Sequence, residues 1–83
     1  MSELAPRDFS DLWPFVQVVE TGSFSEAARR MGTTKASVSK AVARLEKVLQ
    51  LKLLNRSTRR IGLSEAGREI YQHAVRMIEE GRA

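Results

Sequence analysis

The sequence has 83 residues, of which 42% are hydrophobic, and its formal net charge is +4, so it can form one small domain with a modest core. It has no cysteine and one histidine, which excludes a disulfide framework and leaves no ligand set for a metal. Because its apolar runs are too short for a membrane span and residues 1–9 do not resemble a signal peptide, we expect a cytoplasmic protein without membrane contact.

The charges are segregated along the chain. Residues 29–60 hold ten basic residues and one acidic residue, a net +9, whereas the remainder carries a net −5. This distribution favours a polyanion as the partner of the middle third. Charge alone leaves open a solvated basic face that has no partner.

A first helix is predicted from about Ser10 to Gly22. Residues 1–8 show no period and are expected to be frayed. The apolar residues that follow recur at helical spacing: Leu12, Phe15, Val16 and Val19. Proline is tolerated best in the first turn, so Pro14 should lie near the start of this helix.

Two further helices with a tight turn between them follow. Ser23 and Glu26 form an S-x-x-E capping box that opens a short helix ending at Gly32, and Thr33 or Thr34 can cap the next helix, which runs to about residue 49 or 50. The small residue, turn glycine and apolar anchors of a helix-turn-helix occur in order, at Ala28, Gly32, Val38 and Ala41. An ordinary αα-hairpin in a small core is the alternative.

The third helix has two chemically different faces. At 100° per residue, one face is apolar, with Val38, Ala41, Val42, Leu45 and Leu49. The other is small, polar and cationic, with Ala36, Ser39, Lys40, Ala43 and Lys47, and Lys35 at its edge. Such a face can enter a DNA major groove, while the free N–H groups at the helix start can meet phosphate.

After this helix the apolar period changes to two. Leu51 and Leu53, then Ile61 and Leu63, flank the polar residues 55–60, which predicts a two-stranded hairpin with a basic tip. Three arginines crowd this tip, and two hydroxyl donors lie between the first and the second of them, so we expect the tip to contact phosphates or a minor groove. The residues concerned are Arg56, Ser57, Thr58, Arg59 and Arg60. Arg56 can alternatively fold back onto a carboxylate.

Ser64 can cap a last helix. Its apolar stripe can meet a second copy of the chain in a dimer, through Ile70, Tyr71, Ala74, Met77 and Ile78. Alternatively, or in addition, the stripe packs on the first helix of the same chain. The predicted fold is mainly α: a winged helix-turn-helix of three helices plus a two-stranded wing (residues 1–63), followed by a long linker and dimerisation helix (residues 64–83).

Catalysis has little support in the sequence. His73, the single histidine, lies at the edge of the last helix's stripe, without a nucleophilic triad, paired carboxylates or a phosphate-binding glycine loop. We therefore expect neither an enzyme nor a bound cofactor or metal.

The runs FVQVVETGSFSEAARRMGTTKASVSKAVARLEKVL and LKLLNRSTRRIGLSEAGREIY resemble the N-terminal domain of LysR-type bacterial transcriptional regulators. The resemblance implies sequence-specific binding to double-stranded DNA by a homodimer or homotetramer on an inverted-repeat operator, with the helix at about residues 34–49 in the major groove and the wing on the backbone or minor groove. The residues expected to contact DNA are Ser23, Thr33, Thr34, Lys35, Ala36, Ser37, Ser39, Lys40, Arg44, Arg56, Ser57, Thr58, Arg59 and Arg60.

The sequence departs from the family pattern at two places. Lys35 and Ala36 stand where many members have Gln and Pro, so a base preference is not carried over. Gln50 replaces a usual glycine after the third helix. The resemblance also implies that a small-molecule effector acts only through a domain that this chain does not contain.

Two other functions fit a winged helix. One is a module that binds another protein, and the other is a DNA binder of a different winged family. Protein-binding faces are rich in aromatic and apolar anchors, whereas the third helix offers Ala, Ser and Lys. The sequence therefore favours DNA.

Overall fold

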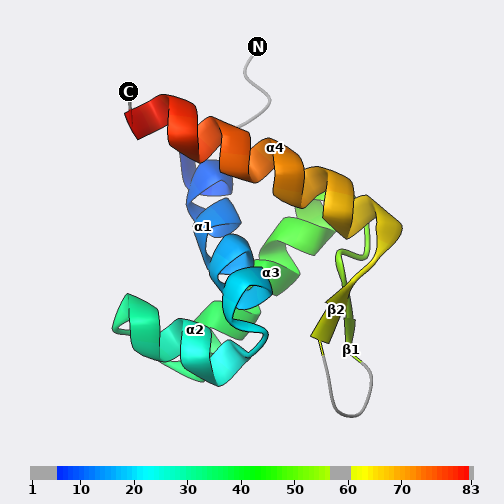
Figure 1. Ribbon diagram of the computed structural model, residues 1–83. Coiled ribbons are helices and arrows are strands. Elements are labelled where there is room, and N and C mark those ends of the chain that lie inside the picture. Colours follow the sequence, from blue (N-terminus) through cyan, green and yellow to red (C-terminus); the bar gives the residue numbers. More distant parts are fainter. Residues whose placement is uncertain (1–5, 57–60, 83) are drawn as a thin grey trace.

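The structure, a computed structural model, describes the backbone of residues 6–56 and 61–82 and the side chains of residues 10–56 and 61–80. The elements follow in the order α1 (Pro6–Thr21), α2 (Phe24–Met31), α3 (Lys35–Leu49), β1 (Leu54–Arg56), β2 (Ile61–Leu63) and α4 (Glu65–Arg82). In Figure 1, α4 lies across the upper part of the molecule, while α2 and the hairpin extend below it on opposite sides. This is the predicted winged helix-turn-helix followed by a long helix.

Helix α1 begins earlier than the sequence predicted. It starts at Pro6, so the expectation of a frayed segment was wrong for residues 6–8, and residues 1–5 lie outside the described residues. Pro14 lies well inside the helix instead of near its start. Proline removes one helical N–H bond, but the ring of Pro14 is buried beside Phe15 and Val16. Burial of this apolar segment offsets the lost hydrogen bond.

Side-chain caps begin α2 and α3. The Ser23 hydroxyl accepts the Glu26 N–H at 3.1 Å, and the Thr34 hydroxyl accepts the Ser37 N–H at 3.0 Å. Thr34, not Thr33, is therefore the cap of α3. The predicted capping box is formed only in one direction, because the Ser23 N–H donates to the Thr21 hydroxyl at 3.3 Å and the Glu26 carboxylate pairs with Arg29.

Both helices of the motif end with a left-handed residue. Gly32 has φ 71° and Gln50 has φ 56°. After each, an N–H reaches back one turn, from Thr33 to the Ala28 carbonyl at 2.9 Å and from Leu51 to the Glu46 carbonyl at 3.1 Å. A glycine adopts this conformation freely, whereas a residue with a Cβ does so at a cost of about 1 kcal/mol.

The core lies where α1, α2 and α3 meet and extends beneath the hairpin and α4. Ala28 of α2 is buried in this core, and the apolar face of α3 supplies Val38, Ala41, Val42 and Leu45. The largest fully buried side chains are Phe15, Leu53, Leu54, Val18, Val38 and Val42. The polar face of α3 therefore remains outside, which orients it towards solvent.

The hairpin is antiparallel, and its register pairs Leu54 with Leu63 and Arg56 with Ile61. Its first strand is shorter than predicted, because Leu51 is outside the strand and exposed while Leu53 and Leu54 are both buried. The alternation expected from Leu51 was wrong because this residue belongs to the cap that ends α3. Arg56 lies in the ladder instead of at the tip, and residues 57–60 lie outside the described residues.

Helix α4 contacts both the hairpin, through β2, and α1. The Ser64 hydroxyl accepts the Gly67 N–H at 2.9 Å, which confirms the predicted cap. Gly67 is buried so close to the chain before β1 that an added Cβ would lie 2.0 Å from the Leu53 carbonyl oxygen. Ala74, about two turns further along, is completely buried in the core.

Candidate nucleic-acid interface

The face of α3 expected to meet DNA is on the surface. Lys35, Ala36, Ser37, Lys40, Ala43 and Lys47 are exposed, and Ser39 is half-buried. Among them no acidic side chain occurs, and the single acid of this helix, Glu46, is engaged elsewhere. The short alanine and serine side chains of this face let the helix backbone approach a groove, and the longer lysine side chains can reach base edges or phosphates.

The start of α3 has features that favour binding of an anion. Thr33 and Thr34 precede the helix and are exposed, and the first turn contains Lys35 but no acidic residue. The helix N-terminus carries unpaired N–H groups and a partial positive charge, of which Thr34 satisfies one by capping Ser37. The remaining groups and the Lys35 ammonium carry charge of one sign, which suits phosphate.

Arg44 holds α1 and α3 together. Its Nε and one Nη donate to the two carboxylate oxygens of Asp11 at 3.0 and 2.9 Å. Asp11 is buried, while the Arg44 side chain is 56% exposed. The hydrogen bond to Asp11 and the charge of that carboxylate raise the pKa of Arg44, against a small opposing effect of desolvation. The DNA contact predicted for Arg44 would thus be made by a guanidinium that is already oriented by Asp11.

Arg56 connects the wing to the start of α2. Its guanidinium carbon lies 4.8 Å from the centre of the Phe24 ring. The partner that the structure gives Arg56 is thus an aromatic ring, whereas the alternative considered from the sequence was a carboxylate. A cation over an aromatic face is attracted by the ring's negative π-cloud. Ser23, the neighbouring cap of α2, is half-buried. The predicted contacts at Ser57, Thr58, Arg59 and Arg60 lie outside the described residues.

Two residues that hold the wing were missed by the sequence analysis. Glu46 accepts the N–H groups of Leu53 and Leu54 through one carboxylate oxygen, at 2.8 and 3.2 Å. Gly67 allows the same segment to touch α4. One signal was visible in advance, because Glu46 is the only acid in the basic third of the chain.

The predicted dimer stripe on α4 is divided between core and surface. Ala74 has no exposed surface and packs inside its own chain, in line with the alternative of packing on the first helix, because α4 lies against α1. Ile70, Tyr71 and Ile78 are half-buried against the same core, and Met77 is also half-buried.

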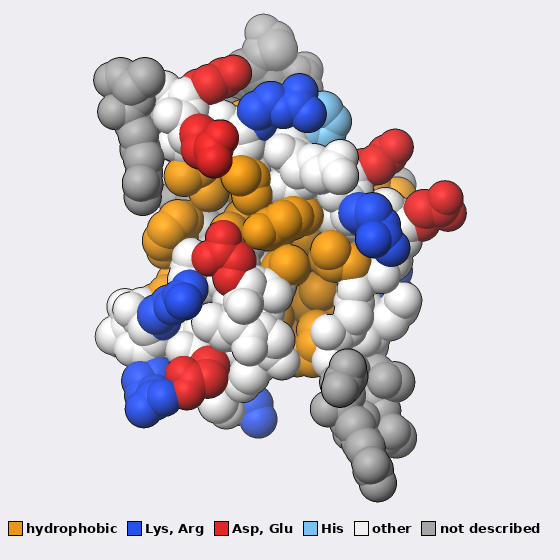
Figure 2. Space-filling view, viewed as in Figure 1, with side chains coloured by type: hydrophobic (Ala, Val, Ile, Leu, Met, Phe, Trp, Pro, Cys, Tyr) orange, Lys and Arg blue, Asp and Glu red, His pale blue; other side chains and the backbone are white. Residues whose placement is uncertain are grey.

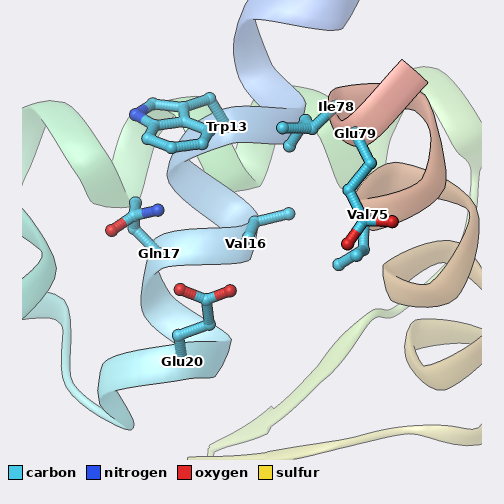
Figure 3. A pocket seen from close by; sticks show the side chains of 7 residues that line it. All are labelled: Trp13, Val16, Gln17, Glu20, Val75, Ile78 and Glu79. Atoms are coloured by element: carbon cyan, nitrogen blue, oxygen red, sulfur yellow. The ribbon is translucent and has the colours of Figure 1, made fainter. Parts of the chain in front are cut away.

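A hollow of about 200 Å³ lies between α1 and α4. Figure 3 shows that one wall comes from α1 and the other from α4: Trp13, Val16, Gln17 and Glu20, with Val75, Ile78 and Glu79 opposite. Trp13 is 41% exposed. Figure 2 shows hydrophobic side chains gathered on this side of the molecule with acidic and basic groups around them.

Polar contacts link the hollow between α1 and α4 to helix α2 of the helix-turn-helix. Glu20 of α1 accepts from Arg30 of α2 and from the Tyr71 hydroxyl of α4, each at 3.4 Å. Partial burial, with the nearby charge of Glu20, raises the pKa of Tyr71. Arg30 also donates to the side-chain carbonyl of the buried Gln17 at 3.0 Å.

No metal-binding group and no membrane-spanning helix occur in the described part of the chain. It holds no group of three acidic or histidine side chains that could bind a metal, and His73 is exposed on α4. None of the described helices combines the length and apolar character needed to cross a membrane.

The family described as "Bacterial regulatory helix-turn-helix protein, lysR family" matches residues 9–68. The probable HTH-type transcriptional regulator LtrA of Klebsiella pneumoniae is 53% identical over 72 residues, which cover 87% of this chain and 23% of LtrA. The HTH-type transcriptional activator AaeR of Escherichia coli (strain K12) is 56% identical over 66 residues, which cover 80% of this chain and 21% of AaeR. The chain thus spans less than a quarter of the length of these curated relatives.

Solved structures of isolated DNA-binding domains superpose closely. The DNA complex of the CbnR DNA-binding domain has a TM-score of 0.83 and 35% identity, and the match covers 89% of this chain and 86% of that one. The complex of the BenM DNA-binding domain with catB site 1 DNA has a TM-score of 0.86 and 30% identity, covering 89% of this chain and 82% of that one.

Proposed function

The chain belongs to the LysR family of bacterial helix-turn-helix regulators, and we propose that it is the part of such a regulator that binds DNA sequence-specifically. The observation that carries the proposal is the exposed face of α3, which is small, polar and cationic while the opposite face is buried. The similar domains of CbnR and BenM are known in complex with DNA. Helix α3 would enter the major groove, and the function requires no catalytic step.

Within α3 we assign different roles to neighbouring residues. Lys35 and Ser39 would read base edges, and Lys40 would meet a base or a phosphate. Ala36 and Ala43 would let the helix come close to the groove. Thr33, Thr34 and Ser37, at the helix start, would bind backbone phosphate, as would Ser23 and Arg44.

The wing would bind backbone or minor groove on one side of α3. Arg56 is exposed and braced over Phe24. Residues 57–60 add two hydroxyls and two arginines, which suit phosphate oxygens. These contacts would position the protein without selecting a sequence.

Two copies would bind the two halves of an inverted repeat. The surface proposed to bring them together is formed by Ile70, Tyr71, Met77 and Ile78 of α4, next to the hollow lined by Trp13. These side chains are half-buried and Trp13 is exposed, and apolar groups that remain partly exposed favour association with a second apolar surface. In a full-length regulator, residues 1–63 would form the DNA-binding unit and residues 64–83 the connection to an effector-binding domain, and the protein would act on DNA in the cytoplasm.

The proposal is tested by selecting preferred duplexes from a random pool with the parent chain and with Lys35→Ala and Ser39→Ala. Arg76→Ala, which removes an exposed positive charge of α4 outside the proposed interface, is the matched control. Loss of a base contact should weaken the preference at one position of the site by about 1–3 kcal/mol, whereas loss of a phosphate contact weakens all duplexes alike.

Variants that melt like the parent and keep its sequence preference and affinity would remove α3 from the role of reader. A parent chain that binds duplex DNA without any salt dependence would instead favour the protein-binding alternative, because phosphate neutralisation imposes a steep dependence.

A further inference from the structure

The placement of the wing depends on very few contacts. Each of its strands has three residues, and a two-stranded hairpin of this size is marginal on its own. Besides the contact of Arg56 with Phe24 and the packing of Ile61 and Leu63 against the core, its position relative to α3 is set where the chain enters β1, at Leu53 and Leu54. Both side chains are fully buried, so this entry point is a rigid part of the core.

The backbone at this entry point is held from two sides. On one side, a single oxygen of Glu46, in the last turn of α3, accepts the N–H groups of Leu53 and Leu54 at 2.8 and 3.2 Å. On the other side, the Leu53 carbonyl accepts the Ser64 N–H at 2.9 Å and lies against Gly67 of α4. Glu46 is thus a direct hydrogen-bonded link between the helix that would read DNA and the strand that leads into the wing.

The charge of Glu46 should work against DNA binding. Residues 29–60 otherwise carry only positive charge, and a carboxylate in this region repels phosphate. If charge were the whole effect of this side chain, its neutralisation would tighten the complex. A geometric role predicts a different outcome, because it depends on the reach of the side chain and not on its charge.

We propose that Glu46 is a positioning residue for DNA binding, whose carboxylate sets the wing relative to α3 by holding the amides of Leu53 and Leu54. The inference rests on the proposed function, in which α3 and the wing bind one duplex together. A wing displaced from its place would no longer reach the phosphates, while α3 would still enter the groove. Glu46 itself does not touch DNA in this arrangement.

Two conservative variants separate geometry from charge. Glu46→Gln removes the charge but keeps an acceptor oxygen at the same distance from the backbone. Glu46→Asp keeps the charge but withdraws the carboxylate by about 1.5 Å, the length of one carbon–carbon bond, which breaks hydrogen bonds of this length. Glu80 is an exposed acidic residue near the end of α4, so Glu80→Gln is the control for removal of a negative charge away from the hairpin.

The experiment measures the dissociation constant for one selected duplex over a series of salt concentrations, by fluorescence anisotropy, for the parent and the three variants. We expect Glu46→Gln to stay within about twofold of Glu80→Gln. We expect Glu46→Asp to bind about threefold to tenfold more weakly, with a salt slope that is shallower by about 0.9 for each phosphate that the wing no longer neutralises. Amide hydrogen exchange at Leu53 and Leu54 should accelerate in Glu46→Asp only.

Glu46→Asp that is folded and binds like the parent would overturn the proposal, as would Glu46→Gln that weakens as much as Glu46→Asp. If Glu46→Asp does not fold, Glu46→Gln decides: protected amides with parent-like affinity support the proposal, and unprotected amides with parent-like affinity overturn it. Failure of the parent and of Glu80→Gln to bind the duplex would count against the proposed function and not against the role of Glu46.

Discussion

Replacement of Gly67 by alanine tests the close contact between α4 and the chain that enters the wing. In most helices this change stabilises, by about 1 kcal/mol, because alanine prefers the helix. Here the new Cβ would lie 2.0 Å from the Leu53 carbonyl oxygen and 2.9 Å from its carbonyl carbon. Both are backbone atoms, so a change of rotamer cannot relieve the clash.

The size of the effect follows from which atoms must move. The carbonyl of Leu53 accepts the Ser64 N–H at 2.9 Å, and the Leu54 N–H of the same peptide group donates to Glu46 at 3.2 Å, so a shift of this peptide strains hydrogen bonds on both sides. Overpacking of this kind costs about 1–3 kcal/mol or more. Because two backbone atoms must move, we expect a cost in the upper part of this range, about 2–3 kcal/mol. With the helical preference of about 1 kcal/mol deducted, the net loss is about 1–2 kcal/mol, which lowers Tm by roughly 4–16 °C in a domain of this size.

Thermal denaturation followed by circular dichroism measures this loss, and Gly62→Ala is the matched control. Gly62 is an exposed glycine of β2, and an added Cβ would meet nothing within 4 Å. Its replacement should leave Tm unchanged or raise it slightly. A Gly67→Ala variant that melts at or above the temperature of the parent would refute the close approach of α4 to Leu53.

Three further predictions concern stability. Gln50→Gly should raise Tm by a few degrees, because it relieves a left-handed strain of about 1 kcal/mol; an unchanged or lower Tm would contradict this. Arg44→Ala should lower Tm because it leaves the buried Asp11 carboxylate without its two hydrogen bonds. Arg44→Lys should restore Tm only in part, because an ammonium cannot donate in the same paired geometry. Full restoration by lysine would contradict the role of the paired hydrogen bond. Burial and the nearby Glu20 raise the pKa of Tyr71, so the folded chain holds the phenol proton more tightly than the unfolded chain does. The stability that this difference contributes is fully present below the ordinary tyrosine pKa. It is lost as the pH rises through the pKa of the folded chain. Tm measured from pH 8 to 11 should therefore fall less in Tyr71→Phe than in the parent, and equal falls would refute the coupling.

The sequence by itself determined the order of elements and the face of α3 that meets solvent. Period and capping residues are local properties, so Ser23, Gly32 and Ser64 could be assigned to helix ends without tertiary information. The apolar side of α3 likewise predicted that Ala36 and Lys40 lie outside. These predictions hold because a helix presents its side chains in a fixed angular order.

Only the tertiary structure decided the contacts between segments that are distant along the chain. The interior position of Pro14 depends on the core around it, and the burial of Ala74 depends on α4 lying against α1. The amides that Glu46 accepts, the carboxylate that orients Arg44 and the peptide that excludes a side chain at Gly67 all belong to other elements. Spacing along one helix specifies which side a residue faces, but the atom that it meets there is set by how the helices and the hairpin pack in three dimensions.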